Sequence, residues 1–138
     1  MESAPAGYVP EVLFPEDVSS EAARLPITEI AGFLRQHLGG TMTAYISGVN
    51  DPKMVTRWIN GRSTPRPQPQ SRMRESYQAT RFLVSAYGDE TARAWFNGSN
   101  ARLDDMAPAF VLRNARSWEE LRLIVPAARA FVAGRPSR

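Results

Sequence analysis

The sequence from residue 48 to residue 65 reads Gly-Val-Asn-Asp-Pro-Lys-Met-Val-Thr-Arg-Trp-Ile-Asn-Gly-Arg-Ser-Thr-Pro, and it decides how the first half of the chain folds. Asp51 is a favourable helix N-cap, and Pro52 suits the first helical position, where the missing N–H needs no partner. Gly61 is a natural helix end because glycine readily adopts left-handed backbone angles. We therefore predict a tight turn followed by a short helix over residues 52–60.

Two chemically different faces run along this predicted helix. The inward face is apolar and should dock on the preceding helices through Met54 or Val55, Trp58 and Ile59. The outward face and its exit carry the candidate DNA-binding side chains, which are Lys53, Thr56, Arg57, Asn60, Arg62 and Arg66. Arg and Lys match guanine acceptors or phosphates, and Asn can pair with adenine, so this face suits the major groove. The spacing from Gly48 to Val55 exceeds the commonest helix-turn-helix pattern by one residue, so either the turn is enlarged or Met54 takes the inward place.

Apolar residues at helical spacing predict helices in the rest of the chain, over residues 27–38, 42–47, 71–87, 90–97, 107–114 and 117–133. Asp89 is expected to cap the helix that follows it. Ser117 and Glu120 have the spacing of a capping box at the start of the last helix. Pro126 should kink or split that helix.

Two proline-containing segments are expected to lack regular structure. Residues 1–25 form a mostly irregular acidic arm in this interpretation, with room for a short helix around 17–24. Residues 62–70 contain Pro65, Pro67 and Pro69, which should keep the segment extended. No strand-like alternation is present, so the protein should be all-α. The expected organisation is an arm over 1–25, a helix-turn-helix bundle over 26–66, and a small helical domain with a C-terminal tail over 71–138.

The charge distribution indicates a polyanionic partner for the middle of the chain. The net charge is only +3, but six bases fall in the 22 residues from Lys53 to Arg74. Residues 1–34 hold six acids and one base, whereas residues 35–81 hold eight bases and two acids. A solvated face seldom collects so many cations, and a polyanionic partner explains the cluster better. The alternative for residues 27–66 is a structural three-helix bundle with a solvated charged face.

Several classes of chemistry are disfavoured. The chain has no cysteine, which removes disulfides, thiolate zinc sites and thiol nucleophiles. His37 has no second histidine beside it, and Asp104-Asp105 fits the cap of helix 107–114 better than a metal or acid–base pair. We expect no catalytic site, no metal and no cofactor. No apolar run approaches the ~20 residues needed to span a bilayer, and residues 1–7 do not resemble a signal peptide, so a soluble cytoplasmic protein is expected.

A pattern in the second half resembles the toxin-binding domain of Xre/MbcA/ParS-type antitoxins. Residues 94–112 read Ala-Trp-Phe-Asn-Gly-Ser-Asn-Ala-Arg-Leu-Asp-Asp-Met-Ala-Pro-Ala-Phe-Val-Leu. The matching positions occur in the family's order: Trp95, Asn100, Leu103, Pro108 and Leu112. Ala107 stands where the family usually has Thr, and Asp104-Asp105 stands where Gly is common. The family often carries an Xre-like helix-turn-helix in front, so the resemblance covers roughly residues 27–134.

The resemblance implies a type II antitoxin with two working ends. The C-terminal unit would bind and neutralise a RES-domain toxin, a class that resembles NAD-consuming enzymes. The residues implied for that contact are Phe131, Val132, Arg135, Pro136, Ser137 and Arg138. The helix-turn-helix would bind operator DNA in a homodimer, or in a hetero-oligomer with the toxin, and repress the protein's own operon. The alternatives are a stand-alone helix-turn-helix regulator with a C-terminal dimerisation domain, and a helical interaction module that has lost DNA binding.

Overall fold

The structure is a computed structural model that describes residues 15–134, and residues 1–14 and 135–138 lie outside the described part. The described residues contain helices, turns and one isolated bridge between Asn100 and Met106, with no strand, which confirms the all-α class. The elements are α1 (Pro15–Arg24), α2 (Ile27–Leu38), α3 (Gly40–Ser47), α4 (Pro52–Ile59), α5 (Pro67–Tyr87), α6 (Asp89–Asn97), the 3₁₀ turn η1 (Ala101–Leu103), α7 (Pro108–Asn114), α8 (Trp118–Leu121) and α9 (Ile124–Ala133).

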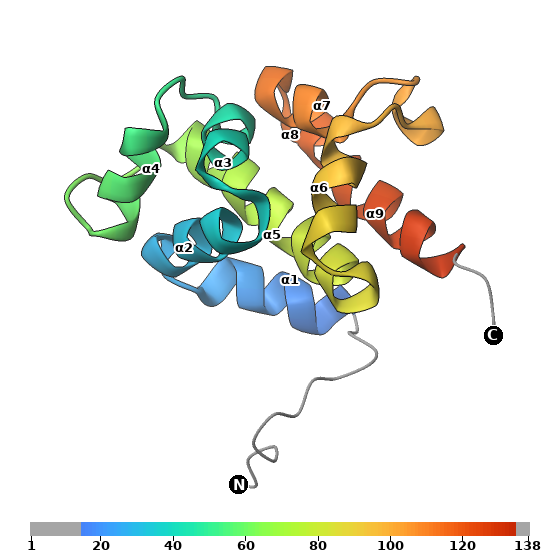
Figure 1. Cartoon of the computed structure of the whole chain (residues 1–138), viewed down its shortest axis with the longest axis horizontal. Coiled ribbons are helices and arrows are strands. Elements are labelled where there is room, and N and C mark those ends of the chain that lie inside the picture. The colour runs from blue at the N-terminus through green and yellow to red at the C-terminus, as the bar shows by residue number, and fades with distance from the viewer. Residues whose placement is uncertain (1–14, 135–138) are drawn as a thin grey trace, which may run out of the picture.

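Helix α5 runs through the middle of the molecule and joins its two halves. It packs against α1, α2 and α3 on one side and against α6, α7 and α9 on the other (Figure 1). One continuous cluster of buried apolar side chains surrounds it, including Leu34, Met73, Leu83, Phe96 and Ile124. Helix α4 lies at one end of the molecule, where it contacts α2 and α3.

The short helix expected within the N-terminal arm is present as α1, and it belongs to the core. Val18 and Ala22 are buried. Glu21 Oε1 accepts hydrogen bonds from Tyr77 Oη at 2.8 Å and from Arg81 at 2.7 Å. Burial, and then the hydrogen bond to Glu21, raise the pKa of Tyr77 to about 12, so the phenol stays a donor. These contacts attach α1 to α5. The part of the predicted arm over residues 1–14 lies outside the described residues.

The prediction of an extended connector over residues 62–70 was wrong in its second half. Helix α5 begins at Pro67, four residues earlier than the predicted start at residue 71. Pro67 and Pro69 both lie in the first turn of α5, where backbone N–H groups have no partner within the helix, so two prolines cost little there. The first helical bond is donated by Gln70 N to Arg66 O at 3.0 Å.

Two of the predicted aspartate caps were also wrong. Asp89 is the first residue of α6, and its carboxylate contacts His37 Nδ1 at 2.7 Å instead of capping the helix. Asp104 and Asp105 adopt left-handed backbone angles, with φ of 56° and 65°. Helix α7 instead starts after Ala107, which has no side-chain cap. Asx residues tolerate left-handed angles better than most, so this pair serves the turn before α7.

The last predicted helix is split, as Pro126 suggested. The break falls at Arg122 and Leu123, between α8 and α9. Pro126 has no N–H to donate to the carbonyl of Arg122, and its ring would collide with that carbonyl in a continuous helix. Ser117 accepts the expected cap bond from Glu120 N at 3.2 Å, while the Glu120 carboxylate accepts from Arg116 N at 2.6 Å.

Candidate nucleic-acid interface

Helix α4 has the two faces that the sequence predicted. Asp51 caps it by accepting from Lys53 N at 2.9 Å, and Pro52 occupies the first helical position. Val55 and Trp58 are buried, with exposed fractions of 0% and 3%, while Met54 is only partly buried. Val55 therefore takes the inward place, and the turn between α3 and α4 is enlarged. The local caps and the packing of α4 on α2 and α3 fix which side of α4 faces outward.

Arg113, on α7, clamps the turn that precedes α4. Its guanidinium donates to Tyr45 O at 2.8 Å, to Val49 O at 3.1 Å and to Asn50 Oδ1 at 2.7 Å. The guanidinium carbon also lies 4.8 Å from the centre of the Tyr45 ring, a cation–π distance. Tyr45 lies in the last turn of α3 and its carbonyl also accepts from Gly48 N, whereas Val49 and Asn50 belong to the turn itself. Arg113 thus ties the end of α3 and the turn to α7 from more than sixty residues further along the chain.

Arg72, on α5, holds the same turn from another side. It donates to Ser47 O at 3.5 Å and to Ala115 O at 3.2 Å. Burial first, and then the nearby charge of Arg113, lower the pKa of the Arg72 guanidinium below its usual value. A Cβ added at Gly48 would lie 2.8 Å from Arg72 Nη1, and Gly48 has a φ of +93°. The left-handed backbone therefore favours glycine at this position, and a larger residue would also have to displace the end of the Arg72 side chain.

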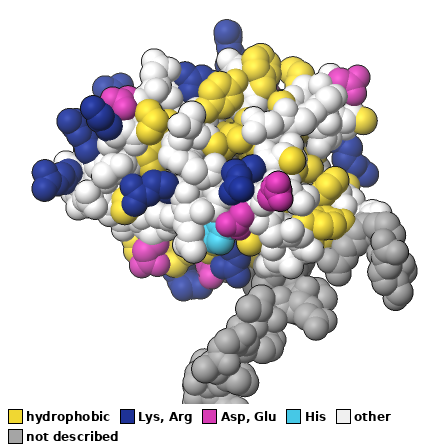
Figure 2. Space-filling model, viewed as in Figure 1, with side chains coloured by type: hydrophobic (Ala, Val, Ile, Leu, Met, Phe, Trp, Pro, Cys, Tyr) yellow, Lys and Arg dark blue, Asp and Glu magenta, His cyan; other side chains and the backbone are white. Residues whose placement is uncertain are grey.

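The predicted DNA-binding side chains all lie on the surface. Lys53, Thr56 and Arg57 are exposed on α4, and Asn60 is exposed at its C-cap. Arg62 and Arg66 are exposed in the segment that leaves the helix. Within residues 15–134 the four cationic side chains among them have no hydrogen-bond or ion-pair partner in the protein. Lys and Arg side chains gather at the end of the molecule where Figure 1 places α4 (Figure 2). The surface formed by these six residues is called the α4 face below.

Arg35 joins the α4 face, and sequence reasoning missed it. Its Nη1 donates to Thr56 Oγ1 at 3.2 Å, so α2 adds an exposed cation beside α4. The hydroxyl oxygen of Thr56 therefore already accepts a hydrogen bond within the protein. Nothing local in the sequence marks Arg35, because its place depends on how α2 crosses α4. Arg35 can be found only by looking for cations on the outward face of α2 once the position of α4 against α2 is known.

Two bases of the sequence cluster are half-buried, bind backbone carbonyls of the protein and do not belong to the α4 face. Arg72 holds the turn, as described above. Arg74 donates to Ala22 O at 2.6 Å and to Leu25 O at 2.9 Å, so it binds the C-terminal end of α1. The cluster from Lys53 to Arg74 therefore overstates the cation density that faces solvent, and four of its six bases remain on the α4 face.

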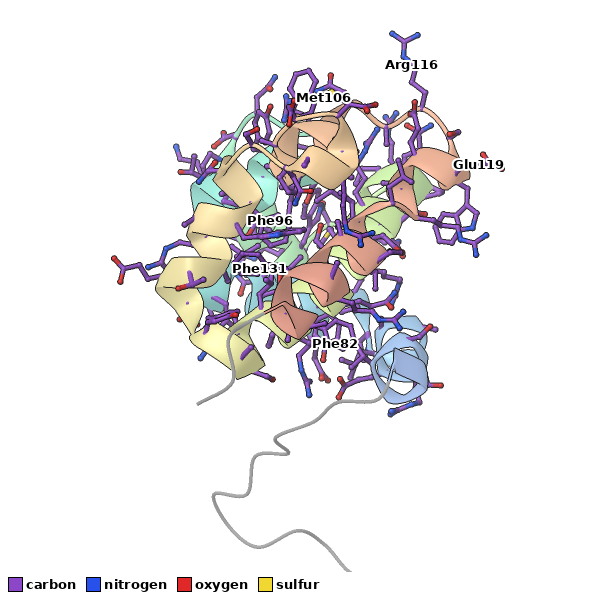
Figure 3. The ribbon with its side chains drawn as sticks, turned by 90° about the vertical axis from the view of Figure 1, so that its right-hand side faces the viewer. Phe82, Phe96, Met106, Arg116, Glu119 and Phe131 are labelled. Atoms are coloured by element: carbon purple, nitrogen blue, oxygen red, sulfur yellow. The ribbon has the colours of Figure 1, made fainter. Side chains whose placement is uncertain are left out.

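The residues implied for toxin binding are only partly within the described chain. Phe131 is 42% exposed on α9, and its ring centre lies 5.3 Å from that of Tyr87. Phe131, which Figure 3 shows on α9, also lines a groove of about 480 Å³ between α6 and α9. Trp95 and Asn100 line the same groove. Val132 is partly buried and packs against the core. Arg135, Pro136, Ser137 and Arg138 lie outside the described residues.

His37 makes contacts that hold α2 and α6 together. Besides the contact with Asp89, its ring centre lies 4.4 Å from that of Phe33 on the same helix, and its backbone carbonyl accepts from Arg93 at 3.1 Å. These contacts join α2 to α6.

Over residues 15–134, every helix is too short or too polar to cross a membrane.

Comparisons with protein-family models, with curated proteins and with solved structures found no match to this chain.

Proposed function

We propose that α3, the enlarged turn and α4 form a helix-turn-helix that places the α4 face in the major groove of DNA. The observation that carries the proposal is the pairing of four unpartnered cations with a short helix whose preceding turn is clamped by Arg72 and Arg113. A recognition helix must hold its side chains at fixed positions, because each base contact depends on geometry. Arg57 and Asn60 have the side-chain chemistry for base edges, and Lys53, Arg62 and Arg66 suit phosphates.

Binding to duplexes chosen from a random-sequence DNA library tests this proposal. We expect Lys53→Ala and Arg66→Ala each to weaken binding on all sequences, and to reduce the slope of log K against log salt by about 1. Arg57→Ala should lower the preference for the selected sequence. Arg129→Ala, which removes an exposed arginine from α9, is the matched control and should change neither quantity. Unchanged affinity and salt slope in all three α4-face variants would refute the assignment.

We propose, as the setting for this DNA binding, an antitoxin that neutralises a RES-domain toxin and represses its own operon. This part rests on the sequence resemblance over residues 94–112, supported by the exposed aromatic ring of Phe131 beside the groove that Trp95 lines. Co-expression with a RES-domain toxin tests it. The full chain should restore growth, and Phe131→Asp should restore less. A chain ending at Gly134 that protects as well as the full chain would exclude a role for residues 135–138.

A second candidate is a transcription regulator without a toxin. The observation that favours it is that α5 packs on both halves of the molecule, so the C-terminal helices have a structural role in supporting α3 and α4. A gene for a RES-domain protein beside this one supports the antitoxin. If the full chain binds DNA but fails to protect against such a toxin, the stand-alone regulator is the better description.

A further inference from the structure

An apolar surface lies next to the clamped turn, on the side formed by α3, α6 and α7. Three of its side chains are large and well exposed: Tyr45 at 37%, Met106 at 41% and Phe110 at 47%. Hydrophobic side chains are visible where α3, α6 and α7 meet (Figure 2), and Met106 lies at the upper edge of the molecule in Figure 3. We call this surface the α3/α7 patch. Exposed apolar side chains that cluster in this way mark interaction sites more often than scattered ones.

The α3/α7 patch contains a projection and a hollow side by side. Met42, Tyr45, Asn97, Ala107 and Phe110 are among the residues that line a groove of about 450 Å³. Phe110 stands at the rim of this groove with nearly half of its surface exposed. In a two-fold dimer each copy presents the same surface to the other, so a projection beside a hollow can fill the partner's hollow and receive the partner's projection.

Charges of both signs flank the groove. Arg93 lines it near the end of α2, where it also donates to His37 O at 3.1 Å. Asp104 and Asp105 are exposed in the loop that leads through Met106 to the lining residue Ala107. A two-fold axis through the patch can bring the acids of one copy to the arginine of the other. A partner of a single charge sign would match only one of these two edges, so the charge pattern favours a second copy of this chain.

The position of the α3/α7 patch also favours a second copy of this chain as the partner. Tyr45 belongs to α3, and its carbonyl accepts from Arg113, which is one helical turn after Phe110 on α7. A partner copy seated here would rest on elements that hold the turn before α4. Two recognition helices that read adjacent major grooves must be held about 34 Å apart, which requires a firm connection between the dimer contact and each helix.

We propose that the α3/α7 patch is the contact surface between two copies of this chain, with Phe110 of each copy inserted into the groove of the other. The reason for requiring a dimer rests on the proposed DNA binding, but the contact surface itself is assigned from exposed side chains, groove and charge. Self-association is therefore measured without DNA, so that failure of the dimer and failure of DNA binding are seen separately.

Sedimentation velocity of the full chain across a wide range of concentrations is the first test. We expect a dimer, and we expect Phe110→Arg to weaken dimerisation by about 30-fold, the loss typical of an aromatic anchor in an interface. Trp118→Arg is the matched control, because Trp118 is 53% exposed on α8 and does not line the groove. A monomeric full chain, a Phe110→Arg variant that dimerises as tightly as the full chain, or an equal loss in Trp118→Arg would each overturn the proposal.

A second test combines charge substitutions, so its result does not depend on whether any single variant folds correctly. Arg93→Glu should weaken dimerisation by placing like charges opposite the partner's acids. Adding Asp104→Asn and Asp105→Asn should strengthen dimerisation of Arg93→Glu, whereas the same pair should weaken dimerisation of the unaltered chain. Asparagine tolerates the left-handed backbone at both positions, so the exchange is conservative. Effects of the same sign in both backgrounds would overturn the charge pairing and the assigned surface.

One further outcome would assign the patch to another occupant. If Phe110→Arg leaves the dimer intact but abolishes protection against a RES-domain toxin, the patch belongs to that partner and the proposal is wrong.

Discussion

Replacing Arg113 by alanine removes the clamp between α7 and the turn before α4. The change deletes three hydrogen bonds of 2.7 to 3.1 Å and the contact with the Tyr45 ring. Arg113 is half-buried, so each bond is worth about 1 kcal/mol after exchange with water, and the ring contact adds about 0.5 kcal/mol. Water can reach the released acceptors in part. We therefore expect the free energy of unfolding to fall by about 2–3 kcal/mol, which corresponds to a loss of roughly 10 °C in Tm.

The effect on DNA binding should exceed the effect of partial unfolding. At 25 °C the folded fraction of Arg113→Ala remains high if the parent has ordinary stability, yet the turn that sets the start of α4 is no longer held. We expect DNA affinity to fall by about tenfold, a cost of about 1.4 kcal/mol for ordering the turn on binding. Arg113→Lys keeps the charge but not the branched donor, so both effects should be intermediate.

Thermal denaturation and fluorescence anisotropy with the selected duplex measure the two effects. Arg116→Ala is the control, because Arg116 is an exposed arginine just after α7 whose side chain projects away from the molecule (Figure 3). It should change neither Tm nor affinity. If Arg113→Ala melts and binds DNA like the parent, the turn is held by other contacts and the argument from the clamp is refuted.

Three further predictions concern the same framework. Gly48→Ala should lower stability by about 1–2 kcal/mol, mainly from its left-handed backbone, and an unchanged denaturant midpoint would contradict this. Burial raises the pKa of Glu75 from 4.5 to about 7, against a smaller lowering by Arg122. The folded protein therefore holds this proton more tightly than the unfolded chain, so this contribution to stability is complete below pH 4.5 and is lost as the pH rises to about 7. Glu75→Gln should stabilise the protein by about 2 kcal/mol near pH 8, a value reduced for solvent screening, and flatten the dependence of Tm on pH; a larger gain at pH 5 would have the wrong sign. Glu21→Gln should loosen α1 from α5 and speed amide exchange in α1, while leaving α4 unaffected.

Local signals in the sequence were sufficient to place most helices. Asp51, Pro52 and Gly61 marked the ends of α4, and apolar spacing separated buried Val55 and Trp58 from the exposed side chains. These features depend on residues within one or two turns of each other, so they can be read without knowing the fold. The start of α5 was missed because a proline is harmless in the first turn and harmful later, and the sequence does not say which turn is first.

The sequence could not show which arginines bind backbone carbonyls within the protein and which remain free in solvent. Arg72, Arg74 and Arg113 bind backbone carbonyls that are distant in sequence, whereas Arg57 and Arg62 remain in solvent. An arginine has the same charge in both settings, and only the packing of α1, α5 and α7 decides which carbonyls come within reach. The basic cluster therefore correctly indicated a cationic surface, but it did not show which of its residues form that surface.

Because Arg113 lies far along the chain from the turn before α4, the contact between them forms late during translation. Helices α3 and α4 are translated before α7, and Arg113 is added 53 residues after Asn60. At roughly 10 residues per second the ribosome needs about 5 s to reach it. During that interval the nascent chain has α4 but not the side chain that holds the preceding turn. The DNA binding that we propose for α4 would therefore become possible only late in synthesis, when most of the C-terminal half has already been produced.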